Sequence, residues 1–435
     1  MALPIVAVVG RPNVGKSTLV NRIAQVQDAI VHAQRGVTRD RSYHRADWNG
    51  REFLLIDTGG IETAKDDPFA ESITNQALTA AEEADVIIVL VDATTGVLAG
   101  DEEVARKLKR TKKPVFLVVN KMDTPNRTDE IHDFWALGLG EPWPVSATHG
   151  HGTGDLLDAL VEALPESEPE PETDAIDVAI IGRPNAGKSS LLNRLAGVER
   201  AIVSDVAGTT RDALDIMVER DGVSYRFVDT AGIRRKSQID ESVEYYGFVR
   251  AMRAIDRAEI ALLVIDSTIG VTDGDQRIAN FASERGCALV IVLNKWDLVE
   301  TEEHREKIAD QLEDQLGFVS YAPVMRMSAL TGAKVGRVFD ALNKAYASYT
   351  RQVSTSALNK LLTEMRDFGH TVSKGPRTLR IHYVTQTRVK PPGFTFFANH
   401  PRLADDSFKR YVENRMRAAF DFTGTPIILK FKPKD

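Results

Sequence analysis

The chain has 435 residues, of which 43% are hydrophobic and 27% are charged, and its formal net charge is −7. These proportions exclude collagen-like, disordered and membrane-embedded classes, and the length predicts two to four domains of roughly 100 to 200 residues each. The only cysteine, Cys287, leaves no intrachain disulfide, which favours a reducing cytosol and predicts a buried structural thiol.

The first ten residues, MALPIVAVVG, contain an apolar run that leads straight into a glycine-rich turn. Because the run has neither a basic leader nor a cleavage site, we expect no signal peptide. The longest apolar pieces, such as residues 288–293, fall short of the roughly 18 residues that a membrane-spanning helix needs. The sequence therefore predicts a soluble, cytoplasmic protein.

A glycine-rich loop follows the first predicted strand. Residues 5–9 are fully apolar, and GRPNVGKS at 10–17 then turns into a helix, which is the context that a P-loop requires. Backbone N–H groups of such a loop wrap phosphates, and the helix N-terminus adds its dipole. We expect Lys16 to reach the outer phosphates and Ser17 to offer its hydroxyl to Mg²⁺. This loop alone leaves an ATPase, a GTPase and a small-molecule kinase open.

Two elements that come next are predicted to switch with the nucleotide. Thr38 lies in a glycine-flanked loop, where its hydroxyl and backbone are expected to join the metal only when GTP is present. DTGG follows the apolar strand at 53–56, so Asp57 is expected near the Mg²⁺ and Gly60 near the γ-phosphate.

The motif that reads the base decides between nucleotides. NKMD begins at Asn120, after an apolar strand, and Asp123 can accept two hydrogen bonds from N1–H and the exocyclic amine of guanine. Adenine offers no such donor pair and would leave the carboxylate unpaired. We expect Asn120 to hold the loop, and Ser146 with Ala147 to place backbone N–H groups beside the guanine oxygen. An isolated NKxD is equally well a helix or turn cap, and an isolated SA pair is an ordinary turn.

The whole series returns later in the chain, which makes a chance match untenable. GRPNAGKS begins at residue 182, an offset of 172 from the first loop, and TTRD and DTAG keep this offset. The offset grows to 174 at NKWD and to 182 at SAL, so insertions accumulate in the second copy. Thr209 is an alternative to Thr210, which we prefer because only that column is threonine in both copies.

Each copy therefore supplies one set of expected site residues. The residues expected to act in hydrolysis are Lys16, Thr38, Gly60, Lys188, Thr210 and Gly232. The expected nucleotide contacts of the first copy are Gly10, Arg11, Pro12, Asn13, Val14, Gly15, Lys16, Ser17, Thr18, Asp57, Thr58, Gly59, Gly60, Ile61, Asn120, Lys121, Met122, Asp123, Ser146 and Ala147. Those of the second copy are Gly182, Arg183, Pro184, Asn185, Ala186, Gly187, Lys188, Ser189, Ser190, Asp229, Thr230, Ala231, Gly232, Ile233, Asn294, Lys295, Trp296, Asp297, Ser328 and Ala329. The expected magnesium ligands are Ser17, Thr38, Asp57, Ser189, Thr210 and Asp229.

The region between the copies and the region after them differ in composition. Alternating proline and acidic residues at 165–174 predict an extended linker between a first domain at 1–164 and a second at 175–349. Residues 350–435 form the last predicted domain, with the order α-β-β-α-β. Residues 351–435 hold 16 basic and 7 acidic residues, a net +9 that leaves −16 for the rest.

The sets GRPNxGKS, TRD, DTxG, NKxD and SA in two consecutive copies, followed by a small basic domain, resemble the Der (EngA) family of bacterial double-Era-like GTPases. The resemblance covers essentially the whole chain, and the tandem arrangement is its most specific feature, because Era and the tRNA-modification GTPase MnmE carry similar motifs once. It implies a large ribosomal subunit partner with its rRNA, a part in assembling that subunit, and a C-terminal domain similar to KH. Neither a membrane nor DNA is an expected partner.

The fold class predicted for the chain is α/β. Two P-loop GTPase domains with doubly wound, mostly parallel sheets are followed by a small α+β KH-like domain. We expect a GTP-hydrolysing switch with two active sites. The alternatives are an RNA-binding scaffold in which one site holds GTP or GDP structurally, and a tRNA-modification GTPase, for which no cysteine or flavin-binding pattern is present outside the GTPase domains.

Two departures from related proteins bear on mechanism. Ile61 and Ile233 stand where a water-orienting glutamine is expected, so hydrolysis should be slow unless another group supplies positioning and charge. The resemblance suggests potassium, with Asn13 and Asn185 as ligands, although an asparagine at this position is equally able to cap the turn.

The C-terminal domain also departs from its namesake, because no GxxG loop, which RNA-binding KH modules use, occurs after residue 350. Its basic residues either meet RNA phosphates electrostatically or dock on the acidic GTPase domains, and the two roles are compatible on different faces. These residues include Lys374, Arg377, Arg380, Arg388 and Lys390. The aromatic residues of PPGFTFF are expected in the core rather than as stacking platforms.

Overall fold

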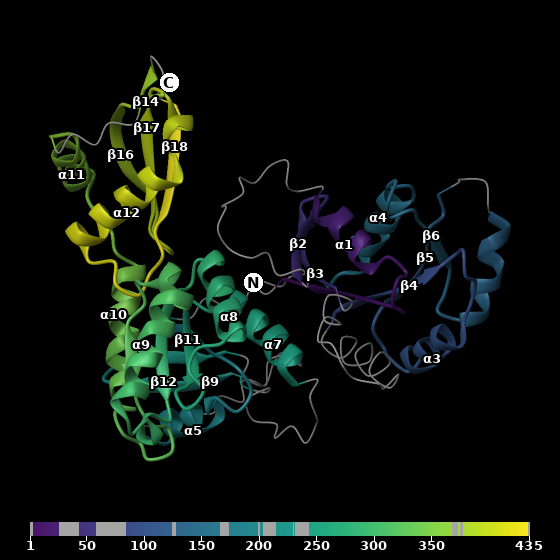
Figure 1. The fold of residues 1–435 in the computed structure, drawn as a ribbon, viewed down its shortest axis with the longest axis horizontal. Helices are drawn as coiled ribbons and strands as arrows, with labels where there is room; N and C mark the ends of the chain where they lie inside the picture. Colours follow the sequence, from purple (N-terminus) through teal and green to yellow (C-terminus); the bar gives the residue numbers. More distant parts are fainter. Residues whose placement is uncertain are drawn as a thin grey trace. The chain divides into compact units, whose positions relative to one another are not determined.

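The computed structural model describes residues 3–25, 43–57, 84–123, 128–165, 174–198, 201–202, 215–228, 230, 243–367, 373–374 and 377–433. Its contacts divide the chain into two units, residues 1–170 and 171–435 (Figure 1). The second unit contains both the second repeat and the C-terminal domain. Among the described helices, none is both long and apolar enough to cross a membrane.

The first unit is a sheet of short apolar strands with helices in the connections. The strand order is β2-β3-β1-β4-β5-β6, and only the pairing of β2 with β3 is antiparallel. Its elements are β1 (Ile5–Val9), α1 (Lys16–Gln25), β2 (Tyr43–Trp48), β3 (Arg51–Asp57), β4 (Val86–Asp92), α3 (Ala99–Leu108), β5 (Val115–Asn120), η2 (Thr128–Leu137), β6 (Pro142–Pro144) and α4 (Thr153–Ala163). Because parallel strands are covered on both faces, their sequences are continuously apolar and not alternating.

The second repeat builds the same sheet with one more edge strand, in the order β13-β12-β11-β7-β10-β9-β8. Its elements are β7 (Ile176–Ile181), α5 (Lys188–Val198), β8 (Ala201–Ile202), β9 (Ile216–Arg220), β10 (Val223–Phe227), α7 (Val243–Arg257), β11 (Ile260–Asp266), α8 (Asp273–Glu284), β12 (Ala288–Asn294), η3 (Trp296–Leu298), α9 (Glu302–Leu316), η4 (Gly317–Val319), β13 (Val324–Arg326) and α10 (Arg337–Tyr349). Successive residues of β7 enter two different cores: Val178 and Ile180 pack into one, and Ala179 and Ile181 into the other. This alternation shows that apolar layers cover both faces of the sheet.

Cys287 lies in the second of these cores, just before β12, and is 3% exposed. Burial raises the pKa of its thiol to about 12, so the thiolate is disfavoured at neutral pH. The expectation of a buried structural thiol is confirmed.

The C-terminal domain follows the predicted α-β-β-α-β order, with a small strand pair that the sequence did not indicate. Its elements are α11 (Thr355–Asp367), β14 (Ser373–Lys374), β15 (Arg377–Thr378), β16 (Ile381–Arg388), β17 (Gly393–Ala398), η5 (Pro401–Leu403), α12 (Asp406–Phe420) and β18 (Ile428–Pro433). Strand β17 pairs antiparallel with β16 and parallel with β18. Phe394 and Phe396 are buried between this sheet and its helices, so the prediction that these aromatic residues belong to the core is confirmed.

The C-terminal domain packs against the second repeat through backbone and side-chain contacts. The Leu289 amide donates to the Gly424 carbonyl and the Gly424 amide donates to the Tyr321 carbonyl, both at 2.7 Å. Lys390 Nζ lies 2.5 Å from Glu259 Oε1. Leu289 is the second residue of β12, whereas the NKWD motif begins at Asn294, the last residue of the strand, so this contact lies at the opposite edge of the sheet from the motif. The docking alternative for the basic domain is therefore observed for Lys390.

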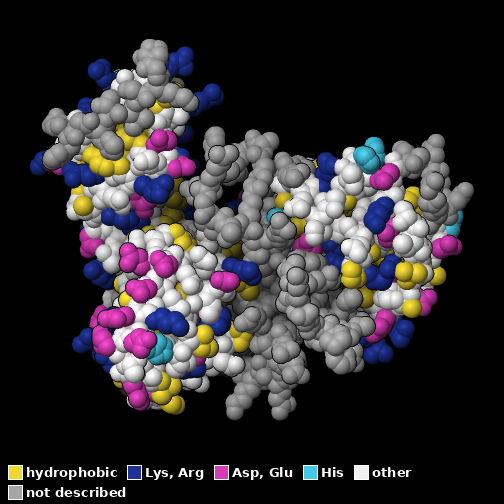
Figure 2. Space-filling view, in the orientation of Figure 1, with side chains coloured by type: hydrophobic (Ala, Val, Ile, Leu, Met, Phe, Trp, Pro, Cys, Tyr) yellow, Lys and Arg dark blue, Asp and Glu magenta, His cyan; other side chains and the backbone are white. Residues whose placement is uncertain are grey.

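Figure 2 shows how charge is distributed over the second unit, with basic side chains spread over the C-terminal domain. Acidic side chains gather over α9, whose sequence EEHREKIADQLEDQL carries them on several turns. Arg377, Arg380 and Arg388 of the C-terminal domain are exposed. These three side chains remain available to a partner, unlike Lys390, which contacts the second repeat.

Candidate nucleotide-binding sites

The first phosphate loop runs from the end of β1 to the start of α1 and is held by its own lysine. Lys16 Nζ donates to the carbonyls of Gly10 and Arg11 at 2.8 and 2.9 Å, and Lys16 is only 5% exposed. Gly15 has φ +97°, a conformation that L side chains rarely adopt. A Cβ at Gly15 would also overlap with Asn120 Nδ2, so this turn requires glycine.

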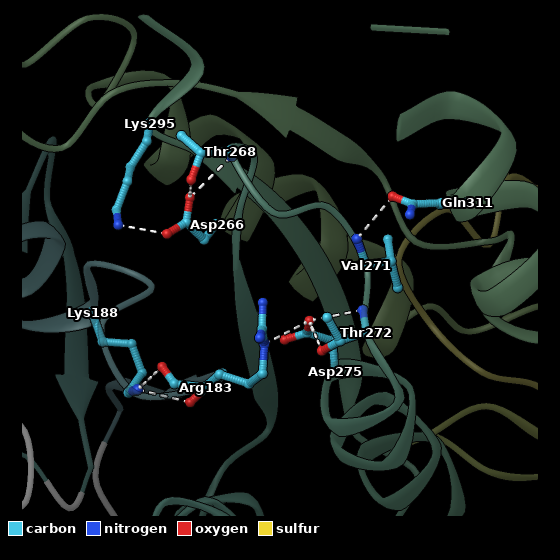
Figure 3. Close-up of polar contacts among 10 residues, drawn as sticks. Arg183, Lys188, Asp266, Thr268, Val271, Thr272, Asp275, Lys295 and Gln311 are labelled. Carbon is cyan, nitrogen blue, oxygen red and sulfur yellow. Dashed lines mark hydrogen bonds and ion pairs between the residues drawn. The ribbon is translucent and has the colours of Figure 1, made fainter. Parts of the chain in front are cut away.

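The second loop has the same arrangement between β7 and α5. Lys188 Nζ donates to the carbonyls of Gly182 and Arg183 at 2.7 and 2.6 Å (Figure 3). Burial lowers the pKa of Lys188 to about 8, and the Arg183 charge acts in the same direction, against the opposing effect of Asp275. Among the described residues, the ammonium therefore donates only to carbonyl oxygens, in a site where an anion would stabilise its charge.

The asparagine of each NKxD motif joins three segments that are far apart in sequence. Asn120 Nδ2 donates to the Val14 carbonyl at 2.8 Å, and Asn120 Oδ1 accepts the Ala147 amide at 2.9 Å. In the second domain Asn294 makes the same bonds to Ala186 and Ala329, with the same two distances. The asparagine therefore fixes the phosphate loop against the SA loop, as expected from its place in the motif.

The lysine of each NKxD motif is paired with an aspartate that sequence reasoning missed. Lys121 Nζ lies 2.5 Å from Asp92 Oδ2 at the end of β4, and Lys295 lies 2.5 Å from Asp266 at the end of β11 (Figure 3). Although burial opposes ionisation, hydrogen bonds from Lys121 and Thr94 lower the pKa of Asp92 below its usual value. The signal was present in the sequence, since VDATTGV and IDSTIGV recur at the offset of the NKxD motifs.

The two base-reading aspartates have different hydrogen-bond partners. The Ser146 hydroxyl donates to Asp123 Oδ1 at 2.6 Å. Ser328 has the same place in the second domain, and its hydroxyl accepts the Thr331 amide at 3.2 Å just as Ser146 accepts the His149 amide at 3.1 Å, but no bond to Asp297 occurs among the described residues. Both aspartates are exposed, so their carboxylates are accessible to a ligand.

Asp57 ends β3 and is fully buried, at 0% exposed. Its backbone neighbour across the sheet is Val8, one residue before the end of β1 and close to the first phosphate loop. Ser17 is the second residue of α1, on the other side of that loop. A hydroxyl and a carboxylate are oxygen donors of the kind that magnesium prefers, so this donor set fits the ion that the sequence predicts.

Several of the expected residues shape the motif loops through their backbone conformation or through contacts within the protein. Asn13 and Asn185 both have positive φ, of 64° and 61°, which asparagine tolerates better than most residues. The Met122 and Trp296 amides donate to Val145 and Met327, which ties each NKxD loop to the strand before the SA pair. Arg326 stacks over Trp296 at 4.8 Å. The described residues also include the expected positions Pro12, Thr18, Pro184, Ser189, Ser190 and Thr230.

The remaining predicted switch residues lie outside the described residues. They are Thr38, Thr58, Gly59, Gly60 and Ile61 in the first copy and Thr210 (with its alternative Thr209), Asp229, Ala231, Gly232 and Ile233 in the second. Their predicted contacts with Mg²⁺, the γ-phosphate and water therefore stay predictions. Among the described residues, no group of three or more His, Cys, Asp or Glu side chains is arranged to hold a metal.

Comparison with known families assigns all three domains. The family described as "50S ribosome-binding GTPase" matches residues 5–121 and 177–295. The family described as "KH-domain-like of EngA bacterial GTPase enzymes, C-terminal" matches residues 352–432. These matches agree with the fold class predicted from the sequence.

Full-length relatives are also found. A GTPase Der of Symbiobacterium thermophilum is 51% identical and aligns with 99% of this chain and 93% of its own. A GTPase Der of Heliobacterium modesticaldum is 50% identical, over 98% of this chain and 97% of its own. A solved structure of Era with MgGDPNP and a segment of 16S ribosomal RNA is 21% identical, covers 60% of this chain and 94% of its own, and has a TM-score of 0.30, too low for any further conclusion.

Proposed function

The chain belongs to the GTPase Der family, and from that premise we propose that it is a cytoplasmic switch whose GTP hydrolysis drives a step in assembly of the large ribosomal subunit. That it is a GTP-hydrolysing enzyme with two GTPase domains follows from the family itself. The proposal adds the process and the partner, and its support is the description of the matched family together with the basic C-terminal domain.

The observation that carries the proposal is the repetition of one hydrogen-bond pattern at two sites. In each domain the lysine bridges two loop carbonyls, and the asparagine joins the phosphate loop to the SA loop. The lysine arrangement serves phosphate binding, so its presence in both domains supports a nucleotide at each site. We therefore assign both sites to GTP and GDP, with Asp123 and Asp297 reading guanine.

Magnesium is the metal of the proposal, with Ser17, Asp57 and Ser189 as its ligands among the described residues. When bound, it neutralises charge on the β- and γ-phosphates. The residues of this chain orient the nucleotide around the metal. The backbone N–H groups of the loop donate to phosphate oxygens, and Lys16 or Lys188 adds a positive charge. Thr38, Thr210 and Asp229 complete the proposed ligand set outside the described residues.

Potassium is a second proposed cation, with Asn13 and Asn185 as ligands. The positive φ of both residues gives an independent backbone reason for asparagine at this position. Turnover compared in potassium and in sodium at equal ionic strength decides between the two roles. Equal rates contradict a potassium site, and the asparagines then serve only to form the turn.

The ribosomal partner is assigned to the C-terminal domain and to its exposed arginines. Lys390 is engaged by Glu259 and Tyr346 of the second repeat, so it holds the domain in place. Arg377, Arg380 and Arg388 are exposed and basic, which suits contact with rRNA phosphates. Contact of this kind weakens steeply as salt rises, because counterions are released from the RNA.

The test is co-sedimentation of the purified protein with isolated large and small ribosomal subunits. Binding to the large subunit with a non-hydrolysable GTP analogue, and not with GDP, is the expected result, and it should weaken across a salt series. Lys16→Ala and Lys188→Ala are assayed separately for turnover. If only one substitution changes turnover, the alternative of a scaffold with one structural nucleotide replaces the switch; absence of binding to either subunit contradicts the ribosomal role.

A further inference from the structure

An arginine of each phosphate loop contacts a helix that lies outside all of the recognised motifs. Arg11 Nε donates to Asp101 Oδ1 at 2.8 Å, and Arg183 Nε donates to Asp275 Oδ2 at 3.1 Å (Figure 3). The two carboxylates are 2% and 0% exposed, in the first turns of α3 and α8. In both GTPase domains an equivalent ion pair therefore joins the phosphate loop to the start of the corresponding helix, α3 or α8.

Each aspartate is fixed by the first turn of its own helix. Asp275 Oδ2 accepts the Thr272 amide at 3.1 Å and the Thr272 hydroxyl at 2.7 Å. Asp101 Oδ2 accepts the Leu98 amide at 3.0 Å. A carboxylate at this position of a helix satisfies backbone N–H groups that have no other partner. The aspartate thus presents its charge to the arginine from a rigid support.

A glycine precedes each aspartate and leaves room for the arginine. A Cβ at Gly274 would lie 3.3 Å from Arg183 Cδ, and a Cβ at Gly100 would lie 3.0 Å from Arg11 Cδ. Both distances are tighter than ordinary contacts between carbon atoms. The arginine stem therefore passes directly over the helix start, and the pairing needs glycine there as well as the two charges.

The same arginines are bound on their backbone by the phosphate-loop lysines. The Arg183 carbonyl accepts Lys188 Nζ at 2.6 Å, and the Arg11 carbonyl accepts Lys16 Nζ at 2.9 Å. The ammonium has three N–H donors, two of which go to these carbonyls, so a lysine that turns toward phosphates redirects donors from the carbonyls to the nucleotide. The ion pair to the aspartate does not involve the lysine, so it persists when the lysine changes partner.

We infer that Asp101 and Asp275 are positioning residues for phosphate binding. Through the arginine side chain, each holds the phosphate loop in its receptive shape while the lysine moves from the loop carbonyls to the nucleotide. This inference rests on the proposed assignment of the loops to GTP and GDP. Both carboxylates are buried and bonded to the arginine, so on this inference their removal should weaken the phosphate contacts and spare recognition of guanine.

The test uses full-length protein in which Lys16→Ala silences the first site, after calorimetry has established that this background binds one GDP per chain. Asp275→Asn then removes the charge and keeps the shape, and Arg183→Lys keeps the charge and loses the planar fork. Dissociation constants for GDP and GMP are measured by competition against a fluorescent GDP. GDP should bind about tenfold more weakly to Asp275→Asn. The affinity of Asp275→Asn for GMP, which lacks the β-phosphate, should fall by less than about threefold. The GDP affinity of Arg183→Lys should lie between that of the Lys16→Ala background and that of Asp275→Asn.

The matched control is Glu302→Gln, which breaks the exposed pair of Glu302 with Arg305 on α9 of the same domain and should leave both constants unchanged. Asp101→Asn in a Lys188→Ala background repeats the test at the first site and decides the matter if Asp275→Asn does not fold. Folded variants with unchanged GDP affinity, or with equal losses for GDP and GMP, overturn the inference and leave the pair a structural role. A Lys16→Ala chain that binds two nucleotides or none overturns the proposed sites themselves.

Discussion

The two GTPase domains agree most closely around the NKxD motif. Asn120 and Asn294 each donate to a phosphate-loop carbonyl at 2.8 Å, and each accepts an SA-loop amide at 2.9 Å. The paired lysines lie 2.5 Å from their aspartates in both domains. Identical motif residues therefore produce identical bonds wherever the side chains are buried between loops.

The domains differ at the hydrogen bonds of the base-reading aspartates, whose own side chains are exposed, and where a further domain is attached. Both serine hydroxyls accept an amide of the following turn, from His149 and Thr331, but among the described residues only Ser146 also donates to its aspartate, Asp123. Only the second domain carries the C-terminal domain, which contacts the start of β12. Buried contacts therefore fix the phosphate loop of each site in the same way. The copies differ at the rim, by which we mean the base-reading aspartates Asp123 and Asp297, and at the edge of the sheet farthest from the motifs.

The largest expected effect tests the buried agreement. Gly15→Ala and Gly187→Ala each force a side chain into positive φ, of 97° and 99°, and into the asparagine amide. Backbone strain and one lost hydrogen bond together cost about 2 to 3 kcal/mol. Each variant should reduce GDP stoichiometry from two to one per chain in calorimetry at micromolar protein. A large loss at one site and none at the other breaks the comparison.

A smaller effect should be confined to the second unit. Gly424 has φ +82°, and a Cβ there would lie 2.8 Å from Ala345 Cβ, so Gly424→Ala should loosen the C-terminal domain by about 2 kcal/mol. Urea unfolding followed by the near-ultraviolet signal of GDP-saturated protein should show an earlier transition for the second unit only. GDP affinity at either site should stay unchanged, because the contact lies at the far edge of the sheet. A change in GDP affinity would show that this edge and the site are coupled.

The pH dependence of the second site follows from the depressed pKa of Lys188, about 8 in the nucleotide-free protein. Phosphate binding favours the charged ammonium, so binding requires proton uptake once the pH exceeds this pKa. GDP affinity in a Lys16→Ala background should therefore fall about tenfold between pH 7 and pH 9. In Lys188→Arg the dependence should disappear, since arginine stays charged. A flat profile for Lys188 itself contradicts the prediction.

The smallest effect sharpens the difference between the rims. Ser146→Ala removes the hydroxyl that orients Asp123, at a cost of about 1 kcal/mol, or roughly fivefold in GDP affinity at the first site. Ser328→Ala should change the second site less than about twofold, because its hydroxyl holds only the adjacent turn. Both are measured with the other site silenced by its lysine substitution. Equal losses would mean that nucleotide binding brings Ser328 to Asp297.

Much of the fold could be predicted because the strands are continuously apolar and each motif follows a strand. The pattern correctly indicates the strands that end at Asn120 and Asn294 and the helices that begin at Lys16 and Lys188. It also gives the order of the C-terminal elements. The antiparallel strand pair β14 and β15 escaped prediction, since two-residue strands carry no periodicity.

The candidate sites could be predicted in their motifs but not in their supporting contacts. The supporting aspartates lie between the motifs, and an isolated aspartate in a sequence is typical of a turn or a helix cap. These residues are Asp92, Asp266, Asp101 and Asp275. Only packing brings each of them to a lysine or an arginine at least 29 residues away in sequence. Docking of the C-terminal domain was one of its two expected roles, but its bonds to Leu289 and Tyr321 escaped prediction, because they depend on two surfaces that fold separately.

The bond between the Leu289 amide and the Gly424 carbonyl has a consequence for synthesis. A chain made from its N-terminus adds residue 424 long after residue 289, an interval of 135 residues. Domains generally fold as units while translation proceeds, at about 5 to 20 residues per second. The first GTPase domain can therefore be complete while most of the chain is still unmade, whereas β12 gains its last backbone acceptor only when translation is nearly finished.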